Sequence, residues 1–178
     1  MKNIALHLLE VCENSIKANA NSLSISVEIR DGKIAFSVKD DGKGFYTIKL
    51  EPYFLEKGSH LREFGNGLRL LKNDCEKSSG ELEIVSEIGK GTCVTAEFLC
   101  DYSEDVVGDL PSVVSALLTE IDLRLSFDYD FLGRKFHFDS FELKEILKSE
   151  DIYLPKAILF ARNYIKENIE KLNGGLAI

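Results

Sequence analysis

The sequence predicts an α+β fold, a two-layer α/β sandwich in which helices cover one face of a mainly antiparallel sheet. Three features lead to this prediction. Residues 4–18 have the 3.6-residue period of an amphipathic helix, four short segments alternate apolar and polar residues as strands do, and glycine-containing turns separate these elements. Their order is helix, two strands, loop, helix and two strands, and a smaller C-terminal α+β appendage follows.

The first helix is expected at residues 4–18. Its apolar side consists of Ala5, Leu8, Leu9, Cys12 and Ile16, and its opposite side carries His7, Glu10, Asn14 and Lys17. Strands are expected at 23–29 and 34–38, and the Asp31-Gly32 pair between them favours a tight hairpin turn.

The glycine-rich stretch from Asp40 to Gly44 ends the second strand. Residues 46–64 show no clear period and are expected to form a mobile loop, a lid with at most one helical turn. A helix at 68–76 follows Gly65-Asn66-Gly67, and strands at 81–86 and 92–99 are joined by Gly89-Lys90-Gly91.

A change of composition at 101–109 predicts a boundary between a domain of residues 1–100 and an appendage of residues 101–178. The appendage is expected to contain a helix at 111–121, a hairpin of 123–130 and 134–138, and helices near 140–148 and 155–172. Its role is either to bind a partner or a second copy of the chain, or to form part of the core.

Composition excludes several classes of protein. The 44% hydrophobic content of the 178 residues is that of a globular protein, and the formal net charge of -8 argues against nucleic acid and anionic membranes as partners. No segment approaches the roughly 18 apolar residues of a membrane span, and the N-terminus does not resemble a signal peptide. The four cysteines lack metal-binding spacing and are expected to be buried, reduced thiols in a cytoplasmic protein.

Candidate site residues lie where predicted elements begin or end. Glu10 and Asn14 are four apart on one helix, so Glu10 could orient or deprotonate a water while the Asn14 amide oxygen ligates Mg²⁺. Taken alone, such a pair is more typical of a solvated helix face. Asp40, followed by Gly42 and Gly44, could accept a hydrogen bond from an exocyclic amine, although Asp and Gly are also the usual residues of a turn.

The other two glycine motifs extend this pattern. Gly65-Asn66-Gly67 at the start of a helix offers backbone N–H groups to phosphate, and Gly89-Lys90-Gly91-Thr92 supplies a hydroxyl beside an unobstructed wall. Each motif is weak by itself, and their order within about a hundred residues is the informative observation.

This conjunction resembles the superfamily of gyrase, heat-shock chaperone, histidine kinase and mismatch-repair ATPases (GHKL). Residues 9–18 look like its first motif, Asp40 to Gly44 match its D-x-G-x-G box, Gly65-Asn66-Gly67 resembles its second glycine box and Gly89 to Thr92 its G-x-G-T motif. The resemblance covers roughly residues 1–99 and implies the Bergerat ATP-binding fold, a histidine-kinase-like ATP-binding domain, with ATP and Mg²⁺ as cofactors.

The resemblance also implies a role for each residue. Asp40 would bind the adenine amino group with Thr92 nearby, and Gly42, Gly44 and Gly91 would border the adenine pocket. Asn14 would hold Mg²⁺ against the phosphates, Gly65 and Gly67 would contact them, and Glu10 would be the catalytic general base. Lys57, His60 and Arg62 lie in the expected lid, but no motif assigns them.

A narrower resemblance is to small stand-alone histidine-kinase-like ATPases of anaerobic bacteria, often encoded near iron-only hydrogenase genes. Pro52-Tyr53-Phe54 and the tail at 102–118 carry it. The short lid also resembles that of anti-sigma-factor kinases, whereas Arg69 stands where many histidine kinases have a third glycine. Because the first motif begins close to Met1, the chain is expected to lack a phosphoacceptor domain of its own.

Three functions remain open on this resemblance. The chain could be an ATPase or protein kinase that transfers the terminal phosphate to a Ser or His of a separate partner. It could be a non-catalytic nucleotide-sensing module that remodels a partner-binding surface, or a slow ATPase that forms a homodimer when ATP is bound.

Overall fold

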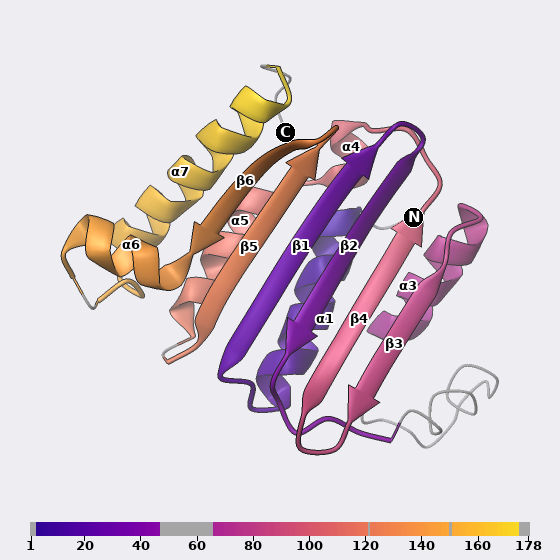
Figure 1. Cartoon of the computed structure of the whole chain (residues 1–178), viewed down its shortest axis with the longest axis horizontal. Helices are drawn as coiled ribbons and strands as arrows, with labels where there is room; N and C mark the ends of the chain where they lie inside the picture. Colours follow the sequence, from indigo (N-terminus) through magenta and orange to yellow (C-terminus); the bar gives the residue numbers. More distant parts are fainter. Residues whose placement is uncertain (1–2, 47–65, 121, 150, 175–178) are drawn as a thin grey trace.

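The computed structural model describes residues 3–46, 66–120, 122–149 and 151–174. Its elements, drawn in Figure 1, are α1 (Ile4–Lys17), β1 (Ser22–Arg30), β2 (Lys33–Asp40), α3 (Gly67–Lys77), β3 (Leu82–Glu87), β4 (Gly91–Phe98), α4 (Glu104–Val107), α5 (Leu110–Ala116), the 3₁₀ turn η3 (Leu117–Thr119), β5 (Arg124–Phe131), β6 (Arg134–Asp139), α6 (Ser140–Leu147) and α7 (Pro155–Leu172). Residues 47–65, where the lid is expected, lie outside the described part of the chain.

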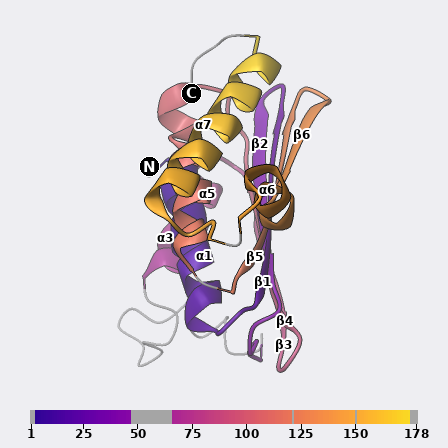
Figure 2. The ribbon, with the colours of Figure 1, turned by 90° about the vertical axis from the view of Figure 1, so that its left-hand side faces the viewer.

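The strands form a single six-stranded sheet in the order β3-β4-β2-β1-β5-β6. Four neighbouring pairs are antiparallel, and β1 and β5 are parallel, with Leu23 opposite Leu125 and Ile29 opposite Phe131. Helices α1, α3, α5 and α7 all cover the same face, as Figure 2 shows edge-on. The predicted α+β class and its two layers are therefore confirmed.

The expected strands and helices are present with ends within two residues of those predicted, apart from the helix at 111–121. That helix begins with Pro111 in its first turn and ends at Ala116, and the chain continues as the turn η3. The short helix α4 was not expected. None of the helices in the described part of the chain is both long and apolar enough to cross a bilayer.

One hydrophobic core joins residues 1–100 to the C-terminal segment. Every second residue of β1, from Leu23 to Ile29, is buried, and so are Leu125, Phe127 and Tyr129 of the adjacent strand β5. Ala161, Ile165 and Ile169 of α7 complete the same cluster. The C-terminal segment therefore forms part of the core, and the division of the chain at residue 100 stays a prediction.

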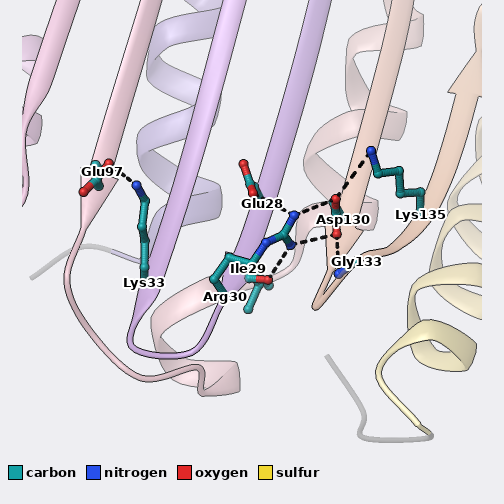
Figure 3. Close-up of polar contacts among 8 residues, drawn as sticks. All are labelled: Glu28, Ile29, Arg30, Lys33, Glu97, Asp130, Gly133 and Lys135. Carbon is teal, nitrogen blue, oxygen red and sulfur yellow. Dashed lines mark hydrogen bonds and ion pairs between the residues drawn. The ribbon is translucent and has the colours of Figure 1, made fainter.

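Charged residues line the face of the sheet that the helices leave open. Arg30 of β1 donates two hydrogen bonds of 2.8 Å to the carboxylate of Asp130 on β5, and it also pairs with Glu28 (Figure 3). These hydrogen bonds hold the pKa of Asp130 below its ordinary value. The pair ties the parallel strands together at one end of the sheet.

The sequence placed His7 on the polar side of α1, and this prediction is wrong. His7 is buried, its Nε2 lies 3.1 Å from Oδ2 of the buried Asp74 of α3, and its ring stacks on Phe98. Because α1 contacts both the sheet and α3, a residue on the side of α1 next to α3 is buried between that helix and the sheet instead of facing water.

Candidate functional site

A cavity of about 440 Å³ opens between the C-terminal half of α1, the end of β2, the start of α3 and the β3–β4 hairpin. Its wall combines polar and charged residues with apolar side chains. The lining residues are Val11, Asn14, Ser15, Lys17, Ala18, Asp40, Lys43, Gly44, Phe45, Tyr46, Leu68, Ile84, Ile88, Thr92 and Val94.

Asp40 is the buried carboxylate of this cavity. Its Oδ1 accepts hydrogen bonds from the backbone N–H groups of Gly42 (2.9 Å) and Thr92 (3.2 Å), and its Oδ2 accepts one of 2.6 Å from the Ser15 hydroxyl. A carboxylate offers about four acceptor positions. Three are therefore used by the protein, and one remains for a donor in the cavity.

Sequence reasoning missed Ser15, which fixes the orientation of Asp40. The two residues are 25 positions apart and meet only because α1 packs on the end of β2. It also missed the role of Asp41, whose Oδ1 accepts hydrogen bonds of 2.8 Å from the N–H groups of Asn21 and Ser22. An Asp after a strand end signals such a turn, but not the segment that it holds.

Two glycines allow the backbone segments around Asp40 to approach each other closely. Gly91 has a φ of +100°, and a Cβ atom built on it would lie 2.0 Å from the carbonyl oxygen of Asp40. Gly44 has a φ of +59°, and its Cβ would lie 2.1 Å from the carbonyl oxygen of Glu87. Any side chain at either position would push the β3–β4 hairpin away from the end of β2.

A chain of hydroxyl groups connects this hairpin to the cavity wall. Thr92 Oγ1 lies 2.8 Å from Ser86 Oγ, and Ser86 Oγ in turn accepts a hydrogen bond from the backbone N–H of Phe45. Thr92 therefore contacts Asp40 through its backbone and the β3 strand through its side chain. Ser86 was not expected from the sequence.

Glu10 and Asn14 lie one turn apart on α1, but only Asn14 lines the cavity. Glu10 instead packs against the first residue of α3, because a Cβ atom built on Gly67 would lie 3.0 Å from Glu10 Oε2. Gly67 thus makes room for the carboxyl group at the N-terminus of α3.

The remaining predicted site residues divide into three groups. Asp40, Gly44 and Thr92 line the cavity with Asn14. Gly42 and Gly91 do not line it: the Gly42 N–H donates to the Asp40 carboxylate, and Gly91 closely approaches the Asp40 backbone. Gly65 and the lid residues Pro52, Tyr53, Phe54, Lys57, His60 and Arg62 lie outside the described residues. Lys17 and Lys43 also line the cavity and bring positive charge that sequence reasoning did not assign.

Burial and the charge of Asp40 shape the electrostatics beneath the cavity. The pKa of the buried Cys12 thiol is raised, first by desolvation and then by the negative charge of Asp40. Cys12 therefore remains a protonated thiol. Cys75 is likewise buried, and desolvation raises its pKa to about 11, whereas Cys93 and Cys100 are only partly buried.

Comparisons with known proteins agree on the same class. Residues 2–101 match the family of histidine kinase-, DNA gyrase B-, and HSP90-like ATPases. The sensor histidine kinase ZraS of Klebsiella oxytoca is 33% identical over 95 residues, which are 49% of this chain and 20% of that protein. This chain therefore matches only about a fifth of the kinase's length.

Two solved structures also match this chain, one of them with a TM-score above 0.5. The N-terminal domain of a DNA repair protein superposes with a TM-score of 0.55 at 13% identity, covering 79% of this chain and 53% of that one. The Aquifex aeolicus MutL ATPase domain complexed with ADP gives a TM-score of 0.46 at 16% identity, covering 84% and 70%. Because the family match extends over more than half of its residues, the chain belongs to the histidine kinase-, DNA gyrase B- and HSP90-like (GHKL) ATPase family.

Proposed function

We propose that the chain binds Mg-ATP in the cavity beside Asp40 and acts as an ATPase or protein kinase on a separate protein partner. The observation that carries this proposal is the hydrogen bonding of Asp40. Its carboxylate is oriented by Ser15, Gly42 and Thr92 and keeps one acceptor position for a ligand. The exocyclic amino group of adenine is a donor of the required kind.

The walls of the cavity suit a flat, apolar ring. Apolar surface comes from four elements, with Val11 of α1, Leu68 of α3, Ile84 of β3 and Val94 of β4, and Gly44 adds backbone without a side chain. Nucleotide sites combine such surfaces with a small number of oriented polar groups. Apolar contacts would thus hold the ring, and the hydrogen bond to Asp40 would determine which edge of the ring faces this carboxylate.

The metal and the phosphates would lie towards Asn14. Mg²⁺ prefers oxygen ligands and is usually held by one or two protein oxygens together with phosphate oxygens and water. The Asn14 amide fits this role because it lines the same cavity as Asp40, one helical turn after Glu10 on α1. Bound Mg²⁺ would neutralise phosphate charge during transfer, and Lys43 adds a positive charge on the cavity wall.

Glu10 is the residue proposed to act as general base. Its carboxyl group lies against Gly67 at the start of α3, one helical turn from Asn14. A carboxylate there can accept a proton from an attacking water or from a partner's hydroxyl or imidazole as the terminal phosphate is transferred. Glu10, the proposed general base, is thus separate from the residues that bind adenine.

Calorimetric titration of Mg-ADP and Mg-ATP tests the binding site. The Asp40→Asn variant keeps an oxygen acceptor for Gly42 and Thr92 but can present an N–H₂ group to the adenine amine, so we expect micromolar binding to the wild type and a loss of at least about tenfold in the variant. Asp41→Asn is the matched control, because Asp41 is the adjacent carboxylate and does not line the cavity. Equal affinities for the two variants would contradict the proposed role of Asp40.

Turnover of labelled ATP tests the catalytic part separately. We expect Glu10→Gln to bind Mg-ATP as the wild type does while losing about a hundredfold or more in phosphate release or transfer. If the wild type binds ATP but neither hydrolyses it nor transfers its phosphate to any offered partner, the chain is a nucleotide sensor and the enzymatic proposal is wrong.

A further inference from the structure

A second surface of interest lies along the edge strand β6, on the opposite edge of the sheet from the nucleotide cavity. The cavity involves β3 and β4, whereas the sheet ends on its other side at β6. Within the described residues β6 pairs only with β5, so about half of its backbone N–H and C=O groups point outward along this edge. Figure 2 shows the molecule from this side, with α7 in the helix layer beside β6.

Aromatic side chains lie beside this strand edge. Phe136 of β6 meets the ring of Tyr164 of α7 edge-on at 5.8 Å, and Tyr164 stacks nearly parallel on Phe160 at 6.3 Å. Phe160 and Tyr164 are 41% and 37% exposed, although both are large aromatic residues. They form an apolar shelf on the helix side of β6 that the described residues leave partly uncovered.

Four basic residues lie around this shelf, in a chain whose formal net charge is -8, although β6 also carries Asp139. Arg134 and Lys135 lie on β6. On α7, positions three, four or seven apart share a helix face, so Lys156 and Lys171 lie on the side that carries the two aromatic residues. All four are exposed. Glu167 is the acidic residue of that helix side among those described.

Lys135 is available to an incoming acid even though Asp130 is near it. Asp130 already receives two hydrogen bonds of 2.8 Å from Arg30, whereas Lys135 Nζ lies 3.8 Å away and its side chain is 78% exposed (Figure 3). Arg30 is shared between Asp130 and Glu28, and Lys135 makes the longest contact of this group of four charges. Because that contact is long and exposed, Lys135 can turn towards an incoming acid at little cost.

We propose that the β6 edge binds an extended, acidic segment of a partner protein, which adds to the sheet as a seventh strand. Backbone hydrogen bonds to β6 would supply the affinity, acidic residues on one side of the added strand would meet Lys135, and apolar residues on its other side would cover Phe160 and Tyr164. A second copy could instead pair β6 with β6. An antiparallel pair centred on this strand places Arg134 opposite Asp139, so sedimentation must distinguish that outcome from peptide binding.

A peptide without any partner protein tests this surface. The chain contains no tryptophan, so the acetylated and amidated peptide EVEWEVE reports its own binding by its fluorescence. We expect a saturable emission shift that is absent with the peptide KVKWKVK and with a version of the acidic peptide carrying proline at alternate positions, which lacks the N–H groups for strand pairing. Hydrogen exchange should show new protection at residues 134–138 and none at the opposite edge strand β3.

Two charge-reversal variants supply the matched comparison. Lys135→Glu is expected to weaken binding about five- to tenfold through loss of one attraction and gain of a repulsion. Lys39→Glu changes the net charge equally but lies on the central strand β2, so it should leave the affinity within about twofold, because salt screens charges beyond roughly 8 Å. Both sites are exposed, so neither variant should disturb folding.

Three results would overturn the proposal. The first is no saturable shift at millimolar peptide. The second is equal binding of the proline peptide, which would mean adsorption without strand pairing, or equal binding by Lys135→Glu, which would mean that Lys135 does not contact the peptide. The third is concentration-dependent dimerisation in sedimentation that Lys135→Glu abolishes, which would make this edge an interface between copies. None of these measurements needs ATP, so they are independent of the proposed nucleotide site.

Discussion

The hydrogen bond from Ser15 to Asp40 can be tested by the substitution Ser15→Ala. Both residues are buried, and the donor and acceptor oxygens are 2.6 Å apart. The Ser15 hydroxyl also lies 3.4 Å from the carbonyl oxygen of Val11, but it has one hydrogen, and the shorter contact with a carboxylate takes it. The substitution therefore leaves one acceptor position of a buried carboxylate without its partner.

The expected loss of stability follows from two opposing effects. A hydrogen bond to a charged group contributes about 1.5–3 kcal/mol, and alanine is favoured over serine inside a helix by roughly 0.5 kcal/mol. The free energy of unfolding should thus fall by about 1–2.5 kcal/mol. Affinity for Mg-ADP should fall as well, because the Asp40 carboxylate loses the group that orients it.

Urea denaturation followed by circular dichroism measures the first effect, and calorimetry measures the second. Ser26→Ala is the control, since Ser26 is exposed on the open face of β1 and should change stability by no more than about 0.5 kcal/mol. If Ser15→Ala were as stable as Ser26→Ala and bound Mg-ADP equally well, the argument that Ser15 orients Asp40 would be refuted.

Three further substitutions test other parts of the structure. In the same urea assay, Gly91→Ala should lower the free energy of unfolding by more than about 3 kcal/mol, because the added Cβ meets the backbone of β2. Gly89→Ala is the control and should lower it by only about 1 kcal/mol, because Gly89 has a φ of +76° but open space around it. Phe127→Ala should cost about 3–5 kcal/mol and keep a single unfolding transition, because β5 shares its core with β1; two separate transitions would contradict this. Arg30→Gln should lower the urea midpoint near pH 7 and lose this effect as the pH falls through the lowered pKa of Asp130, because the pair stabilises the fold only while that carboxylate is ionised; a difference that persists at pH 2 would argue against it.

The local elements were predictable because each has its own period and its own boundary residues. α1 shows the 3.6-residue repeat, β1 and β2 alternate, and Asp31-Gly32 marks their turn. The burial of His7 could not be predicted in this way. A helical period identifies the side that faces the sheet, but it does not reveal that α3 covers another side and supplies Asp74.

Contacts between distant segments account for the other differences. The parallel pairing of β1 with β5 joins strands a hundred residues apart, and neither strand carries a signal that names its neighbour. In the candidate site, Asp40, Gly44 and Thr92 of the glycine motifs line one cavity. Two features of the site depend on how distant segments pack and could not be predicted. One is the close approach of Gly91 to the Asp40 backbone, and the other is the Ser15 hydroxyl that orients the carboxylate.

The parallel neighbour of β1 also affects how the chain must fold during synthesis. When residues 1–100 have left the ribosome, β1 can pair with β2, but its other edge stays unpaired until residue 131 emerges. At about 5–20 residues per second, that interval lasts a few seconds. Throughout it, Leu23, Ile25, Val27 and Ile29 stand on an open strand edge, which is a template for aggregation. The nascent ATPase-family segment is therefore most vulnerable just before its last strands arrive.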